Sequence, residues 1–190
     1  MSPDTGADSI DLLVVDDDPD AREQLGEFCT SRGFRVALAH DGRAALLALQ
    51  RASPSFPIVI SDLHMPHADG FAVLEAAKRA HASCYVVVIT GYATIDVAVQ
   101  AVRAGAYDLL AKPFSLAQLE LVLTRIRDRM ALESENRRLI GHAHGRSAVI
   151  APGGDRSVES RILALEQRLA ALEAVTLGRP AHRTNVSEIR

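Results

Sequence analysis

Residues 58–66 read Ile-Val-Ile-Ser-Asp-Leu-His-Met-Pro, a short apolar run that ends at Asp62 and is followed by a loop. A continuous apolar run of this length is typical of a strand that is buried on both faces, as in a parallel sheet covered by helices. Four other segments have a similar character, and helical patterns separate them. The sequence therefore predicts an α/β protein with strands over 11–16, 35–39, 58–62, 85–90 and 108–111, and with helices over 20–32, 42–52, 70–80, 94–104 and from 115 onward.

Polar side chains stand at or just after the ends of these apolar runs: Asp16, Asp17, Asp62, Thr90 and Lys112. The carboxyl ends of parallel strands line the crevice in which open α/β sheets bind ligands, so we expect these five side chains to converge. Three carboxylates repel one another unless a cation neutralises them. The cluster therefore predicts a Mg2+ site, and its amine and hydroxyl suit a phosphoryl group.

Each motif by itself has an ordinary explanation. An Asp-Asp pair is common in a solvated turn or at a helix cap, and Lys-Pro is common in a surface turn. It is their joint occurrence, each beside its own apolar run, that favours a functional site. Asp18 precedes Pro19 and is interpreted as the N-cap of the first helix rather than as a metal ligand.

In this order and spacing the motifs resemble the receiver domain of two-component response regulators, over roughly residues 10–130. The resemblance implies a flavodoxin-like, doubly wound sheet of five parallel strands in the order 2-1-3-4-5. It also implies that Asp62 accepts a phosphoryl group from a histidine kinase or phosphotransfer protein, and that Thr90 and Lys112 contact that group. The implied Mg2+ ligands are Asp16, Asp17, Asp62 and the backbone carbonyl of His64. Such a domain is no enzyme beyond its own phosphorylation and autodephosphorylation.

Four further positions are interpreted through the resemblance. Pro113 is expected to follow a cis bond, and His64 and Tyr92 occupy positions that tune how fast water removes the phosphoryl group. The family commonly has Tyr or Phe three residues before the lysine, whereas this chain has Leu109. A switch based on the rotation of an aromatic ring is therefore not expected, and Leu109 is expected to pack between the fourth helix and the fifth strand.

Residues 90–94, Thr-Gly-Tyr-Ala-Thr, and residues 105–114, Gly-Ala-Tyr-Asp-Leu-Leu-Ala-Lys-Pro-Phe, are most similar to receivers of nitrogen-regulatory-type transcription activators. Those activators also carry an ATPase domain and a DNA-binding helix-turn-helix. This sequence has no Gly-x-x-x-x-Gly-Lys-[Ser/Thr] loop, and too few residues follow position 140 for an ATPase domain. We therefore expect that the chain is not a complete activator of that kind.

Beyond the expected receiver domain, the prediction is a helix extension and Gly-rich linker over 131–154, a short coiled-coil helix over 155–176 and a disordered tail over 177–190. The last helix of the domain is expected to cover the sheet with a stripe of apolar residues. In the predicted coiled-coil helix, the apolar residues have the a/d spacing of a heptad repeat. Past residue 130 the pattern fits either a stutter into a coiled coil or a frayed, solvated helix. The residues of the stripe are Leu116, Leu119, Leu123, Ile126 and Met130, and those with a/d spacing are Val158, Ile162, Leu165, Leu169 and Leu172.

Composition restricts the partners. The 190 residues carry a net charge of −3 and two cysteines. The weak negative charge argues against a mainly electrostatic nucleic-acid binder, and the two cysteines fit spectator thiols in a reducing cytoplasm. We expect a cytoplasmic protein, because the N-terminus lacks the basic and then apolar order of a signal peptide and no uninterrupted apolar stretch approaches the length of a membrane span.

The leading interpretation is a phospho-accepting signalling protein. Its output is expected to be contact with a downstream protein effector, or homodimerisation, through the face of the fourth helix and fifth strand and through the C-terminal coil. The partner of that coil is left open between a second copy, the helix before the linker and another protein. The alternative is a transcription regulator with a DNA-binding tail. A phosphatase of the haloacid type would need a second acid two residues after its nucleophile, where this chain has His64.

Overall fold

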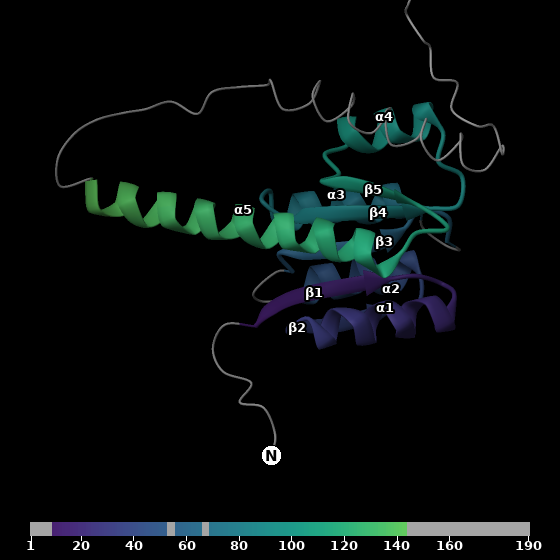
Figure 1. Ribbon diagram of the computed structural model, residues 1–190. Coiled ribbons are helices and arrows are strands. Elements are labelled where there is room, and N and C mark those ends of the chain that lie inside the picture. The colour runs from purple at the N-terminus through teal and green to yellow at the C-terminus, as the bar shows by residue number, and fades with distance from the viewer. Residues whose placement is uncertain (1–8, 53–55, 66–68, 144–190) are drawn as a thin grey trace, which may run out of the picture.

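The computed structural model describes residues 9–52, 56–65 and 69–143, and in these residues strands and helices alternate. The strands form one parallel sheet in the order β2-β1-β3-β4-β5 (Figure 1), so the predicted fold class is confirmed. The strands are β1 (Ile10–Val15), β2 (Phe34–Ala39), β3 (Ile58–Asp62), β4 (Tyr85–Thr90) and β5 (Asp108–Ala111). The helices are α1 (Pro19–Ser31), α2 (Gly42–Arg51), α3 (Gly70–Ala80), α4 (Ile95–Arg103) and α5 (Leu116–Ala143).

Alternate residues of each strand belong to two hydrophobic cores, one on each face of the sheet. Val59 and Val88 pack with side chains of α2, α3 and α4. Ile60 and Ile89 face the opposite way and pack with side chains of α1 and α5. Both faces are therefore covered, which explains why the strands are apolar at nearly every position.

The register of the sheet brings the polar residues to one edge. Val15 lies beside Ser61, so the acids that follow β1 adjoin the end of β3. Asp62 lies beside Ile89, and Thr90 beside Ala111. The carboxyl ends of β1, β3, β4 and β5 consequently meet at the same edge of the sheet, as expected.

The predicted strands over 58–62, 85–90 and 108–111 are confirmed at both ends. β1 ends at Val15, one residue earlier than expected, because the carboxylate of Asp16 accepts a hydrogen bond from the N–H of Asp18 (3.0 Å) and the chain turns there. Asp18 then caps α1 by accepting hydrogen bonds from the N–H groups of Asp20 and Ala21. Its predicted role as an N-cap is confirmed.

The apolar stripe of α5 covers the sheet as predicted except at its first member. Leu119, Leu123 and Ile126 are buried, and Met130 is partly buried against the same core. Leu116 is 37% exposed because it starts the helix, one turn before Leu119, the first side chain of α5 that is buried in the core. The helix continues past the sheet to Ala143 (Figure 1). The predicted linker beyond 143, the coiled-coil helix over 155–176 and the tail over 177–190 lie outside the described residues.

Both cysteines are buried and free, as predicted. Burial raises the pKa of each of the Cys29 and Cys84 thiols to about 12, so neither is a ready nucleophile. In the described part of the chain, no helix has the length and apolar character that crossing a bilayer requires.

Candidate functional site

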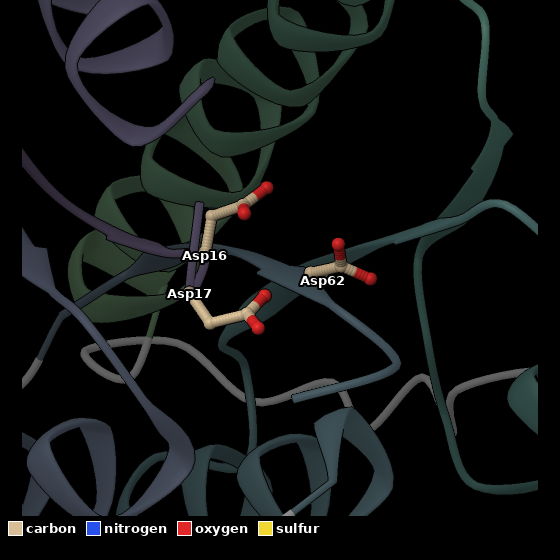
Figure 2. A group of neighbouring side chains, drawn as sticks. All are labelled: Asp16, Asp17 and Asp62. Atoms are coloured by element: carbon tan, nitrogen blue, oxygen red, sulfur yellow. The ribbon is translucent and has the colours of Figure 1, made fainter. Parts of the chain in front are cut away.

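Three carboxylates gather at the carboxyl edge of the sheet. Asp16 and Asp17 follow β1, and Asp62 is the last residue of β3 (Figure 2). One carboxylate oxygen from each lies within 4.8 Å of the others. Asp16 is completely buried and Asp62 is 7% exposed, whereas Asp17 is exposed. Such an all-oxygen set, open to solvent on one side, suits a hard divalent cation.

Lys112 lies between two of these acids. Its ammonium group donates a hydrogen bond to the Asp16 carboxylate (3.1 Å) and another to the Asp62 carboxylate. Burial lowers the pKa of Lys112, but its bonds to Asp62 and Asp16 outweigh this effect, and the pKa is raised overall. Burial also raises the pKa of Asp16, against the opposing influence of the Asp18 N–H and Lys112. Lys112 is therefore a firmly charged cation at this edge.

Thr90 and His64 form the neighbouring part of the site. The buried Thr90 hydroxyl accepts a hydrogen bond from the N–H of Tyr92 (3.1 Å) and lies 3.4 Å from Nδ1 of His64. The ring of His64 meets that of Tyr92 edge-on, with 5.4 Å between the centroids. The N–H of His64 donates to the Asp62 carboxylate (3.1 Å). Two loops, after β3 and after β4, thus contact each other beside Asp62.

All five polar side chains predicted to converge do lie at one edge of the sheet. Comparison of this chain with known protein families is independent of this geometry. The sequence model of the response regulator receiver domain matches residues 12–124. The chain belongs to the response regulator receiver family. The resemblance to receiver domains that its motifs indicated is confirmed.

Curated relatives of the receiver domain include the regulatory protein AtoC of Escherichia coli, which is 33% identical over 128 residues, 67% of this chain and 27% of AtoC. The C4-dicarboxylate transport transcriptional regulatory protein DctD of Pseudomonas aeruginosa is 36% identical and covers 72% of this chain. The nitrogen assimilation regulatory protein NtrX of Azorhizobium caulinodans is 32% identical and covers 74%. The chain spans 27% to 32% of the length of these relatives. The predicted likeness to nitrogen-regulatory-type activators is confirmed.

Solved structures agree with the fold. A response regulator receiver domain protein from Clostridium thermocellum has a TM-score of 0.60 at 25% identity, covering 65% of this chain and 98% of its own. The chemotaxis protein CheY4 of Vibrio cholerae has a TM-score of 0.57 at 28% identity, covering 62% of this chain and 98% of its own. Each match covers less than two thirds of this chain and nearly all of the solved structure.

Two family-based expectations concern the β5 end of the receiver domain. The Lys112–Pro113 peptide bond is cis, as expected. Leu109 is 4% exposed and packs in the same core as Ala101 and Val102 of α4. It therefore occupies the space between α4 and β5 that the sequence assigned to it.

Two residues of this receiver domain that bear on the site were not predicted from the sequence. Gly70 starts α3 so close to the end of β3 that a Cβ atom at position 70 would lie 2.4 Å from the carbonyl oxygen of Asp62. Arg22, on α1, donates hydrogen bonds to the backbone of the acidic loop. In the sequence, Gly70 resembles any glycine that separates two elements, and Arg22 resembles any cation on a helix surface, so no local signal marks their roles.

Proposed function

We propose that the chain is a phospho-accepting response regulator in which Asp62 receives a phosphoryl group from a histidine kinase or phosphotransfer protein. The observation that carries this proposal is the position of Asp62. Asp62 is 7% exposed at the end of the central strand, and its carboxylate lies beside two other acids and within hydrogen-bonding distance of Lys112. A carboxylate is already an anion at neutral pH, so it needs no general base to attack.

In the proposed transfer, one oxygen of Asp62 attacks phosphorus and the bond between phosphorus and the donor nitrogen breaks, with the electron pair returning to that nitrogen. The product is an acyl phosphate on Asp62. Lys112 stands where it can pair with one phosphoryl oxygen, and Thr90 can donate its hydroxyl to another. Positioning and charge neutralisation supply the rate in such a reaction, since the protein has little covalent chemistry to perform.

The donor set fits Mg2+. Asp17 and Asp62 would hold the ion directly, Asp16 directly or through water, and the backbone carbonyl of His64 would provide another oxygen. The supporting observation is that three carboxylates approach within 4.8 Å while Lys112 is the one cation bonded to two of them among the described residues. Bound Mg2+ would neutralise charge on the phosphoryl oxygens.

The output is proposed to be protein contact. Contacts from Thr90 and Lys112 to a phosphoryl oxygen exist only after transfer, and only such differential contacts can shift a conformational equilibrium. They would draw in the loops after β4 and β5, which lead to α4 and α5. Exposed apolar side chains lie on both helices: Ile95 on α4, and Leu132, Leu139 and Ile140 on α5. Docking of an effector, or dimerisation through α5 and the C-terminal coil, would bury them.

The acceptor is tested by incubating the full chain with Mg2+ and a small-molecule phosphodonor and measuring incorporation by intact mass spectrometry. We expect one phosphoryl group on the wild type and none on Asp62→Asn, with both folded in the absence of Mg2+ by circular dichroism. Asp69→Asn is the matched control, because Asp69 caps α3 and asparagine also caps helices. Stoichiometric labelling of Asp62→Asn would refute the proposal.

DctD is named a transcriptional regulatory protein, which favours a second candidate, a transcription regulator with a DNA-binding tail. The residues that would bind DNA lie beyond 143. Fluorescence anisotropy of a labelled duplex distinguishes the candidates, since non-specific DNA binding is lost as salt rises whereas a specific DNA binder still binds at physiological salt. The first proposal expects no binding that survives physiological salt.

A further inference from the structure

Arg22 contacts the candidate site but has no role in the proposed phosphoryl transfer. It lies on α1, and its Nη1 atom donates a hydrogen bond to the carbonyl oxygen of Asp16 (2.8 Å). The same nitrogen lies 3.5 Å from the carbonyl oxygen of Asp17. One guanidinium group thus contacts the backbone of both acids that follow β1. The contact is to their main chain, so it leaves the two carboxylates free for other partners.

The two acids differ in what else holds them. The carboxylate of Asp16 accepts hydrogen bonds from the Asp18 N–H (3.0 Å) and from Lys112 (3.1 Å), and it is completely buried. Asp17 is exposed, and no hydrogen bond or ion pair to its carboxylate is found among the described residues. The direction of the Asp17 carboxylate therefore depends on the backbone of the turn, and it is this backbone to which Arg22 donates its hydrogen bonds.

We propose that Arg22 is a positioning residue for the divalent cation. By fixing the carbonyl groups of Asp16 and Asp17, it holds the turn so that the Asp17 carboxylate stays beside Asp62. This inference rests on the proposed function, in which these acids bind Mg2+. Residues that orient metal ligands from outside typically change metal affinity by about 10- to 100-fold when they are replaced.

The positive charge of Arg22 makes the test decisive, because its electrostatic effect on Mg2+ affinity is opposite in sign to the effect of positioning. A guanidinium group near the acids repels Mg2+, so a purely electrostatic role predicts tighter Mg2+ binding when the charge is removed. A positioning role predicts the opposite, because an unrestrained turn must be ordered when the ion binds. The sign of the change in affinity separates the two.

The experiment is isothermal titration of MgCl2 into the full chain, without any phosphodonor. We expect Arg22→Met to raise the Mg2+ dissociation constant by about tenfold. Arg22→Lys should recover part of the loss, since an ammonium group keeps the charge and can bond one carbonyl but lacks the forked geometry. Arg35→Met is the matched control, because Arg35 forms its ion pair with Asp11 at the opposite end of β1. It should bind Mg2+ like the wild type.

Thermal unfolding without Mg2+ is measured on each variant. If Arg22→Met is not folded at 25 °C, Arg22→Lys carries the test, with a dissociation constant expected to be roughly threefold above that of the wild type. Mg2+ affinity in the folded variant that is equal to or tighter than in the wild type would overturn the inference alone. A wild type that takes up no Mg2+ would overturn the proposed metal site and this inference with it.

Discussion

Gly70 shows how one residue without a side chain shapes the acceptor. Its N–H donates to the carbonyl of Leu63 (2.9 Å), so the start of α3 lies directly against the loop that follows Asp62. A Cβ atom at position 70 would approach the Asp62 carbonyl oxygen to 2.4 Å and the Leu63 Cα to 2.8 Å. Both neighbours are backbone atoms, which cannot rotate away. The site therefore requires glycine there.

We expect Gly70→Ala to destabilise the receiver domain by about 1–3 kcal/mol, because overpacking against backbone forces a shift of α3 or of the acceptor loop. The same shift should slow the phosphorylation of Asp62. Urea unfolding measures the first effect and the rate of labelling by a phosphodonor the second. Gly91→Ala is the matched control, since a Cβ atom there meets nothing within 4 Å. Equal stability of the two variants would show that the loop yields easily.

His64 is positioned to control access of water to the modified Asp62. Its ring lies against Thr90 and Tyr92. We expect His64→Ala to shorten the lifetime of the aspartyl phosphate several-fold while changing its rate of formation less, because loss of the ring admits water. Phosphate release after removal of the donor measures the lifetime. Equal lifetimes for the variant and the wild type would contradict this role.

At the scale of elements, α5 is attached to the sheet where it leaves the receiver domain. Tyr85, the first residue of β4, packs edge-on against Tyr107, with 5.1 Å between the ring centroids. Burial and a hydrogen bond to Glu133 of α5 raise the pKa of Tyr85 to about 12. Burial raises the pKa of Glu133, but its bonds to Arg129 and Tyr85 outweigh this and lower it overall. The attachment thus joins the amino end of β4 to Glu133 in α5.

The sign of each shift sets the pH range of this attachment. The contribution of Tyr85 to stability is complete below its ordinary pKa of 10.0 and is lost as the pH rises through about 12. The contribution of Glu133 is complete above its ordinary pKa of 4.5 and is lost as the pH falls through its lowered value. The attachment is therefore strongest between these two limits.

We expect the absorbance at 295 nm of wild type minus Tyr85→Phe to show a phenol that ionises near pH 12. This follows because ionising Tyr85 would place a second negative charge beside Glu133 in a partly buried site. Circular dichroism at each pH identifies the range over which both proteins remain folded. A difference curve with its midpoint near pH 10 in the folded proteins would show that Tyr85 is not held by Glu133.

At the scale of the whole molecule, the question is how the site communicates with assembly. Residues 134–140 of α5 are exposed, and they include Leu139 and Ile140, which are 55% and 56% exposed. Leu132, just before it, is 64% exposed. A helix with exposed apolar side chains gains stability by packing them against another helix. This is the surface through which we propose that copies or effectors associate.

We expect the molar mass from light scattering, measured across a size-exclusion column, to differ between Mg2+ alone and Mg2+ with beryllofluoride, a mimic of the phosphoryl group. The double variant Leu132→Ser, Leu139→Ser should lose this response. Leu47→Ser, which removes a comparably exposed leucine from α2, should keep it. An unchanged mass in the wild type would mean that assembly does not depend on the acceptor site.

The five strands and the five polar side chains at one edge follow from the sequence, and its resemblance to the receiver family implies the order of the sheet. These features are local, since each strand is a continuous apolar run and each polar residue stands at or just after the end of one. Even the N-cap role of Asp18 follows from its position before Pro19. Parallel topology then brings the strand ends together without further information.

The neighbours that surround those side chains become known only from the way the elements pack in three dimensions. Gly70 must be glycine because the start of α3 touches the end of β3, and Arg22 reaches the acidic turn because α1 folds back beside it. Tyr85 meets Glu133, 48 residues later in the sequence, because α5 crosses the amino end of β4. These contacts depend on how separate elements pack, and packing is set by the shapes of side chains throughout the core rather than by any local pattern.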